Sequence, residues 1–167
     1  MARLVPRKIS SKDLHSIPKM IDISGKPVIK REAVAEGTIY LRKSTMELIE
    51  SGKIEKGDPF QIATFSAIQA IKNTPSSLVM CHPIPIEGSS VEFDKTSDSI
   101  TVRVKVVASS KTGVEMDALN AVSVALLNIW DVVKKYEKND QGQYPDTRIA
   151  DIHVVRKFKE AKSEEGK

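Results

Sequence analysis

The amino-acid sequence predicts an α+β fold in which an antiparallel sheet carries helices packed on one face. Residues 100–106 alternate between apolar and polar side chains, which is typical of a strand with one buried face. Residues 58–74 and 115–136 instead repeat apolar side chains at helical spacing. The expected order of strand, helices, hairpin, helix and strand matches the split β-α-β arrangement of ferredoxin-like folds.

Length and composition indicate one folded domain. The chain has 167 residues, of which 40% are hydrophobic and 29% charged, and these values favour a globular protein with a sizeable core. Residues 1–19 mix prolines and charges without a sustained period, and we expect a flexible N-terminal arm there. Residues 20–157 would form the single domain, and residues 158–167 a charged C-terminal tail.

The first half of the domain is predicted to hold a lead-in, a strand and two helices. Residues 20–24 indicate a short strand or an extended lead-in, and residues 33–41 a strand whose glycine marks a bulge or a close approach. Ser44 to Glu47 has the pattern of a capping box, and Gly52 is placed to end the short helix that follows. Asp58-Pro59 then supplies a cap and a first helical residue for the longer helix.

The second half is predicted to hold a hairpin, a long helix and a last strand. Residues 91–107 form the hairpin around a turn at 95–98. Thr112 to Glu115 has the pattern of another capping box, which would open an apolar helix that reaches about Tyr136. Residues 149–156 supply the last strand.

Charge and cysteine content limit the possible partners and compartments. A formal net charge of +4 suits an anionic ligand, whether a nucleotide phosphate or a nucleic acid. The single cysteine excludes an internal disulfide and fits a reducing compartment. We find neither a signal peptide nor a run that approaches the roughly 18 to 20 apolar residues of a membrane span. We therefore expect a cytoplasmic protein that does not use a membrane.

The least ordinary stretch is Cys81-His82-Pro83-Ile84-Pro85. Because proline fixes φ and restricts the residue before it, the backbone around His82 should be extended and stiff. Such a segment would either hold His82 at the mouth of a pocket or simply cover the core. Adjacent side chains of an extended chain point to opposite sides, so Cys81 should face the core if His82 faces a site. The three histidines are scattered, and no metal-binding spacing occurs.

The long helix carries several charged residues whose positions can be compared. Asp131 and Lys134 are three residues apart and hence neighbours on one face. Asp117 falls about 40° from Asp131 around an ideal helix, so these three could line one wall, whereas Glu115 falls roughly 160° away. Glu115 is thus either a capping acid or part of a site shared between chains. Lys56 precedes a helix start, where it is either an exposed loop lysine or a phosphate contact.

Five motifs occur in the chain in a recognisable order. They are Met20-Ile21-Asp22-Ile23-Ser24, Lys30-Arg31-Glu32-Ala33, Lys56-Gly57-Asp58, Cys81-His82-Pro83-Ile84-Pro85 and Lys111-Thr112-Gly113-Val114-Glu115-Met116-Asp117-Ala118-Leu119. Together they resemble the cyclic pyranopterin monophosphate synthase family, the MoaC proteins of molybdenum-cofactor biosynthesis. The resemblance runs from about Met20 to Lys157.

The resemblance implies a lyase that rearranges cyclic dihydro-GTP into cyclic pyranopterin monophosphate and releases pyrophosphate. It also implies a ferredoxin-like fold and a homohexamer built as a trimer of dimers, with the pocket at a dimer interface. The substrate would come from a radical SAM GTP cyclase. No redox cofactor or metal site is expected, and the resemblance leaves open whether Mg²⁺ accompanies the triphosphate.

The resemblance also assigns residues to roles. The catalytic residues would be Lys56, Asp131 and Lys134, with the last two transferring protons and Lys56 as a second acid or a phosphate contact. A partly desolvated lysine near other cations would have a lowered pKa. The substrate-binding residues would be Lys26, Arg31, His82, Glu115, Asp117 and Lys157. Among these, His82 and Glu115 would orient or protonate the substrate, and Lys26, Arg31 and Lys157 would neutralise the triphosphate.

The chain departs from the family pattern at two places. Asp117 stands where many relatives carry Glu, which shortens the reach of the acid. Lys157-Phe158-Lys159-Glu160 replaces the Lys-Ser-Gly-Gly-Lys run that commonly ends the last strand, so anion contacts from that loop are in doubt.

Two other functions stay open from the sequence. A basic α+β module could bind RNA on its sheet, but the strongest strand has no aromatic residue for base stacking and the chain is only 5% aromatic, so we expect no nucleic acid as partner. The third possibility is an oligomeric scaffold without catalysis, which the intact acidic and basic positions disfavour.

Overall fold

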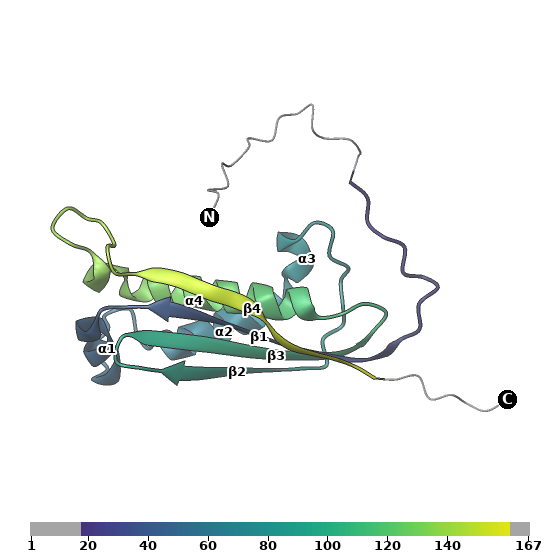
Figure 1. Ribbon diagram of the computed structural model, residues 1–167, viewed down its shortest axis with the longest axis horizontal. Helices are drawn as coiled ribbons and strands as arrows, with labels where there is room; N and C mark the ends of the chain where they lie inside the picture. Colours follow the sequence, from purple (N-terminus) through teal and green to yellow (C-terminus); the bar gives the residue numbers. More distant parts are fainter. Residues whose placement is uncertain (1–17, 161–167) are drawn as a thin grey trace, which may run out of the picture.

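The computed structural model describes residues 18–160 and has the predicted α+β architecture. Its elements are β1 (Ile29–Tyr40), α1 (Lys43–Glu50), α2 (Pro59–Lys72), α3 (Thr74–Ser77), β2 (Gly88–Lys95), β3 (Ser99–Ser110), α4 (Glu115–Glu137) and β4 (Arg148–Lys159). The strands lie in the order β2-β3-β1-β4, and each neighbouring pair is antiparallel. Helices α2 and α4 cover one face of this sheet (Figure 1). This strand order and pairing confirm the ferredoxin-like prediction.

The core lies between the sheet and α4. The inward residues of β3 have no exposed surface, which confirms the alternation read from the sequence; they are Ile100, Val102, Val104 and Val106. Gly37 of β1 allows α4 to approach closely, since a Cβ there would lie 2.9 Å from Leu126 Cδ1 and 2.8 Å from Ile152 Cγ1. The pairing of β1 with β4 also shifts register between Glu36 and Thr38. Both expectations for this glycine, a bulge and a close approach, are therefore confirmed.

Helix α2 begins as predicted, but α1 does not. The Asp58 carboxylate accepts hydrogen bonds from the backbone N–H groups of Phe60 at 2.8 Å and Gln61 at 3.4 Å. Helix α1 begins at Lys43, before the expected capping box at Ser44, and no side chain caps it. The backbone N–H of Arg42 donates instead to the Glu137 carboxylate at 3.1 Å, a partner from the far end of α4.

The capping box expected at Thr112 is also wrong. Helix α4 begins at Glu115, and no side-chain hydrogen bond caps it. The backbone N–H of Thr112 donates to Ser110 Oγ at 3.0 Å, and the Glu115 carboxylate accepts from Lys157 Nζ at 2.8 Å. In a capping box Thr112 and Glu115 would bond to each other's backbone. Here Thr112 bonds within the preceding turn, and Glu115 bonds to Lys157 of β4.

Two strands are longer than predicted. β1 begins at Ile29 rather than at residue 33, and β4 runs to Lys159, past the boundary expected after Lys157. Their added ends pair with each other, with Arg31 opposite Lys159. Glu32 of β1 forms ion pairs with Arg156 of β4 and with Lys105 of β3, so charged side chains conceal the strand pattern at the start of β1.

The N-terminal prediction is only partly open to comparison. Residues 20–24 join no strand of the sheet, so the alternative of a short strand is wrong. Ser24 begins a turn in which the backbone N–H of Lys26 donates to the Ile23 carbonyl at 3.0 Å. The predicted arm at 1–19 lies outside the described residues except for its last two, and so does most of the predicted tail at 158–167.

The expectation that no apolar run approaches the length of a membrane span is wrong for helix α4. Its 23 residues include an 18-residue window with a mean hydropathy of 1.4, enough by length and composition to cross a membrane. Half of that window is buried inside the protein. Packing on the sheet and on α2 accounts for this apolar composition.

Candidate active site

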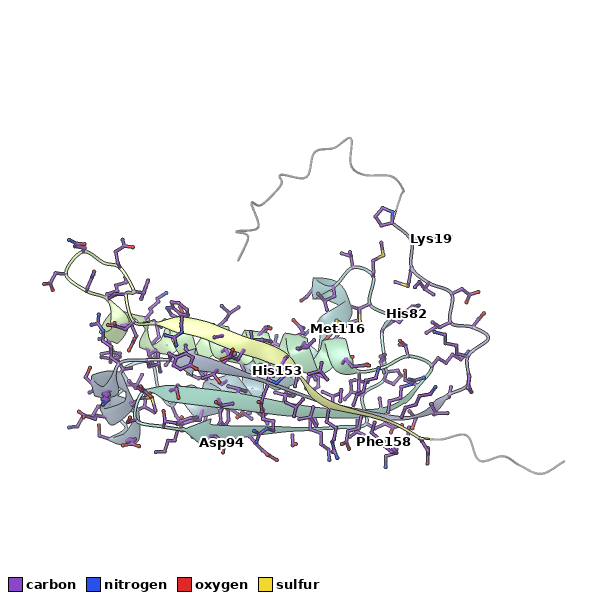
Figure 2. All side chains as sticks on the ribbon, viewed as in Figure 1. Lys19, His82, Asp94, Met116, His153 and Phe158 are labelled. Carbon is purple, nitrogen blue, oxygen red and sulfur yellow. The ribbon has the colours of Figure 1, made fainter. Side chains whose placement is uncertain are left out.

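A cavity of about 1240 Å³ opens at one end of the molecule, between the start of α4, the start of β1 and the end of β4. The lead-in and the segment after α3 complete its wall. Apolar side chains form part of this lining, namely Leu78, Val79, Met80 and Met116, and each of them is exposed. Figure 2 shows Met116 and His82 toward the same end of the molecule.

The cavity is strongly basic. Five cationic side chains line it, those of Lys26, Arg31, Lys111, Lys157 and Lys159, against one carboxylate, that of Glu115. His82 lies among them. Because the cations outnumber the carboxylate, the cavity favours a ligand with several negative charges.

The contacts of these cations leave most of the positive charge uncompensated. Arg31 Nε donates to the Ser110 carbonyl at 3.0 Å, and Lys111 Nζ donates to the Ser24 carbonyl at 2.8 Å. Both acceptors are neutral, so the hydrogen bonds fix the two side chains without cancelling their charge. Only Lys157 has a carboxylate partner in the lining, since its Nζ lies 2.8 Å from Glu115 Oε1.

Glu115 is held ionised by that contact. Burial would raise its pKa, but the hydrogen bond from Lys157 and the charge of Arg31 together lower it. The carboxylate also folds back over Gly113, where a Cβ would lie only 1.8 Å from Glu115 Oε2. A glycine at position 113 therefore gives Glu115 the space to reach Lys157.

Cys81 and His82 both line the cavity, so the expectation that Cys81 faces the core is wrong. The chain turns before them, because the backbone N–H of Cys81 donates to the Leu78 carbonyl at 2.8 Å. Adjacent side chains are not forced apart in a turn as they are in a regular strand. Burial and the charge of Asp117 raise the pKa of the Cys81 thiol, which therefore stays protonated and is a poor nucleophile.

Asp117 lies in the protein interior close to this wall. Only 2% of its surface is exposed, and its Oδ2 has no hydrogen-bond partner within residues 18–160. Burial raises the pKa of this carboxyl, and the charge of Glu115 adds to the effect. The prediction that it shares a wall with Asp131 is wrong, since fourteen residues of helix separate them by about 21 Å along the axis. The prediction compared only the angles of the two residues around the helix and ignored the distance between them along its axis.

A second cluster lies near the other end of α4. Asp131 Oδ1 lies 2.7 Å from Lys134 Nζ, and Asp131 Oδ2 lies 2.6 Å from Lys56 Nζ. We call Lys56, Asp131 and Lys134 the triad. About half of the surface of each side chain is exposed. The neighbour relation of Asp131 and Lys134 and the inclusion of Lys56 agree with the predicted grouping.

The protonation states within the triad differ from the expectation. Hydrogen bonds from Lys134 and Lys56 lower the pKa of Asp131 to about 2. The hydrogen bond to Asp131 raises the pKa of Lys134, where the sequence led us to expect a lowered one. In the isolated chain Lys134 is therefore a stable cation, because it pairs with an anion and faces water.

The nine predicted site residues thus separate into two groups. Those that line the cavity are Lys26, Arg31, His82, Glu115 and Lys157, with Asp117 buried close by. The triad lies about 24 Å further along α4, sixteen residues at 1.5 Å each. Lys159 was missed because it was assigned to the tail. Extending the predicted last strand to residue 159 would have placed Lys159 beside Lys157. Lys111 was named only as the first residue of the fifth motif and was not assigned to the site.

Within the described part of the chain, no three His, Cys, Asp or Glu side chains converge in a way that could hold a metal ion. The lining therefore offers cations for an anionic ligand, with no carboxylate cluster for a resident metal.

Comparisons with known proteins agree on one family. A model of the MoaC family matches residues 20–159. A protein of Sulfolobus acidocaldarius named probable cyclic pyranopterin monophosphate synthase is 54% identical over 140 residues, 84% of this chain and 98% of the relative. One of Pyrococcus horikoshii with the same name is 52% identical over 141 residues, 84% and 89% of the two chains. One of Methanothermobacter thermautotrophicus, with equal identity and coverage, is named a probable accessory protein of that synthase.

Proposed function

The chain belongs to the MoaC family, and from that premise we propose that it is a cyclic pyranopterin monophosphate synthase of molybdenum-cofactor biosynthesis. It converts cyclic dihydro-GTP into cyclic pyranopterin monophosphate and releases pyrophosphate, which makes it a phosphorus–oxygen lyase. The observation that carries the proposal is the cavity with five Lys and Arg side chains against one Glu. An oligophosphate matches that charge.

The roles within the cavity follow from the contacts. Lys26, Arg31 and Lys157 bind the triphosphate, and the fixed positions of Arg31 and Lys157 reduce the ordering that binding requires. His82 and Glu115 orient the part of the substrate next to the phosphates. Asp117 supports this wall from the interior.

The triad supplies the proton transfers. Lys134 is protonated and paired with Asp131, so it serves as an acid toward the ring as it opens and closes. Asp131 orients Lys134 and Lys56 together. Acid–base steps of this kind contribute about 10²- to 10⁴-fold each.

One substrate reaches both groups if two chains share each site. About 24 Å of helix separates the triad from Glu115 in one chain. A two-fold axis near the middle of α4 would set the cavity of one chain against the triad of the other. The exposed apolar side chains at the cavity, such as Val79 and Met116, and Leu127 further along α4 would then be covered. Covering the triad would also desolvate Lys134, which opposes the upward shift of its pKa.

Incubation with enzymatically made cyclic dihydro-GTP tests the proposal. We expect pyrophosphate and a pterin product from the wild type, and a loss of about 10²- to 10⁴-fold in kcat for Lys134→Ala. The matched control is Lys135→Ala, which removes the neighbouring exposed lysine that pairs with Glu55. A wild-type protein without turnover would overturn the proposal and favour the accessory role in the name of the Methanothermobacter relative.

Mixing two inactive variants tests the shared site. His82→Ala removes a cavity residue and Lys134→Ala a triad residue, so a mixed dimer keeps one intact site. After subunit exchange, an equal mixture should regain about a quarter of wild-type activity. A mixture that stays inactive, with exchange confirmed by mass spectrometry, would contradict the shared site.

The wider setting is also part of the proposal. Three such dimers form a hexamer in the cytoplasm, and a radical SAM GTP cyclase supplies the substrate. Sedimentation at several protein concentrations distinguishes a hexamer from a dimer.

A further inference from the structure

The tryptophan and the tyrosines gather at the triad end of the molecule. The chain has one tryptophan and three tyrosines. Tyr40 ends β1, Trp130 and Tyr136 lie in the second half of α4, and Tyr144 lies in the connection to β4. This end of the protein thus combines aromatic rings with the cations of the triad.

Two of these rings already have fixed structural partners. The hydroxyl of Tyr136 accepts a hydrogen bond from the backbone N–H of Glu55 at 3.0 Å. The ring of Tyr40 lies 3.8 Å from the guanidinium carbon of Arg148. Both therefore anchor neighbouring segments.

Trp130 and Tyr144 are placed differently. Their ring centroids lie 5.6 Å apart at an interplanar angle of 76°, and each residue is only partly buried. Among the described residues, nothing forms a hydrogen bond with the Tyr144 hydroxyl. The Nζ of Lys138 lies 6.0 Å from the Tyr144 centroid, at the outer limit of a cation–π contact. A flat ligand could displace so loose a contact at little cost.

The pair adjoins the triad in sequence and in space. Trp130 precedes Asp131 directly, and Lys134 follows one helical turn later. Trp130 and Lys134 are four residues apart on α4 and hence neighbours on one face, and the ring of Tyr144 packs on Trp130. An aromatic surface therefore lies beside the residues that transfer protons.

We propose that Trp130 and Tyr144 form the surface on which the fused, guanine-derived ring of the substrate binds, next to Lys134. This inference rests on the proposed function and adds a ring-binding site to it. Nucleobases stack on aromatic side chains, and the reaction remodels the ring system, so the acid must lie beside the ring and not beside the phosphates. The basic cavity binds the phosphates, and the aromatic pair binds the opposite end of the same molecule.

Trp130 is itself the probe, because it is the only tryptophan in the chain. The wild-type protein is titrated with GTP, which carries a guanine ring and a triphosphate, and with inorganic tripolyphosphate. We expect GTP to quench the tryptophan emission and tripolyphosphate to leave it unchanged. Equal responses to the two probes would overturn the inference, whether both change the emission or neither does.

Substitutions at Tyr144 give the second test. Tyr144→Leu should raise KM for cyclic dihydro-GTP and Kd for GTP roughly tenfold to a hundredfold, with kcat changed less. Tyr144→Phe keeps the ring and should stay within about threefold of the wild type. Tyr40→Leu is the control, because it removes a ring that holds Arg148 at the same end. Circular dichroism verifies that each variant is folded.

The outcomes separate this inference from the proposed function. If the wild type turns over and Tyr144→Leu keeps its KM, the aromatic pair only anchors the connection before β4, and the synthase proposal stands. If GTP quenches Trp130 but cyclic dihydro-GTP is not converted, the ring site stands and the synthase proposal fails.

Discussion

Helix α4 carries one buried carboxylate near each end, and the protein treats the two in opposite ways. Near the C-terminal end, Glu137 has no exposed surface and accepts two contacts from the Arg42 N–H, at 3.1 and 3.3 Å, and a hydrogen bond from the Thr147 hydroxyl. Near the N-terminal end, Asp117 is 2% exposed, and its Oδ2 has no partner in the described part of the chain.

The difference separates a structural acid from one beside a functional site. Glu137 connects the end of α4 with the start of α1 and with the residue before β4, so its charge is used to assemble the fold. The Oδ2 atom of Asp117 gains no such contact in the described part of the chain, and Asp117 lies near Cys81 and Glu115, which line the cavity. Unsatisfied buried acids with raised pKa values concentrate at functional sites.

The largest expected effect is on stability at the Glu137 end. Glu137→Ala leaves the Arg42 N–H and the Thr147 hydroxyl without a buried acceptor, and we expect a loss of about 3 kcal/mol in the free energy of unfolding. Urea unfolding at a fixed protein concentration measures it. Glu137→Gln keeps one carbonyl acceptor and should lose about 1 kcal/mol. If the alanine variant were as stable as the wild type, Glu137 would not be the structural acid.

Asp117→Asn should have a smaller effect and the opposite sign. The pKa of Asp117 is raised in the folded state, so the folded protein holds this proton more tightly than the unfolded chain. The stabilisation from that proton is complete below the unfolded pKa and is lost as pH rises through the raised one. Asn does not ionise, so at pH 8 the variant should be more stable than the wild type by about 1 kcal/mol.

The pH dependence is the informative part of that experiment. The advantage of Asp117→Asn should shrink as the pH falls through the raised pKa, because the wild-type carboxyl then regains its proton. Asp140→Asn, at an exposed site, is the control and should show no such trend. A stability difference that stays constant from pH 8 to below pH 3.8, the ordinary pKa of an aspartate, would mean that ionisation of Asp117 is not the cause. Thermal melting at each pH provides the measurement.

The sequence predicted the features of the fold that depend on local chemistry. The alternation in β3, the Asp58 cap and the glycine at position 37 are each confirmed, since neighbouring residues determine them. The capping boxes at Ser44 and Thr112 failed because distant residues compete for the same groups. Glu137 satisfies the Arg42 N–H from the far end of α4, which no local pattern contains.

The sequence predicted several residues that line the candidate cavity, but it did not predict how they are arranged. Angles around a helix placed Asp117 and Asp131 on one wall, but an angle contains no distance along the axis. Lys159 joined the cavity only because β4 pairs with β1 beyond the expected boundary. The position of Cys81 depended on a turn closed by the Leu78 carbonyl, and the proline pattern alone did not show it.

Unlike the two buried acids, the exposed carboxylate of Asp131 should affect the proton affinity of Lys134 and have almost no effect on stability. Asp131→Asn removes the carboxylate whose hydrogen bond raises the pKa of Lys134, so that pKa should fall. The free energy of unfolding should stay nearly unchanged, because exposed ion pairs contribute little. The pH dependence of Lys134 acylation, followed by mass spectrometry, reports the amine pKa, with Lys135 as the internal control. An unchanged Lys134 profile would mean that another group sets its proton affinity.

The smallest expected effect is the coupling between the two buried acids, and it tests whether the ends of α4 are independent. Asp117 and Glu137 are twenty residues apart, about 30 Å along the helix, and share no hydrogen-bond partner. The double variant Asp117→Asn/Glu137→Ala should therefore change the free energy of unfolding by the sum of the single changes, within about 0.5 kcal/mol.

A contacting pair gives the matched control for that double-mutant cycle. The Thr147 hydroxyl donates to Glu137, so Thr147→Val combined with Glu137→Ala should destabilise the protein by less than the sum of the two single changes. Additivity in this control would mean that the bond contributes nothing measurable. Strong coupling between Asp117 and Glu137 would mean that α4 transmits strain along its length, and the division into a structural end and a functional end would then fail. Urea unfolding of both cycles at one protein concentration distinguishes these results.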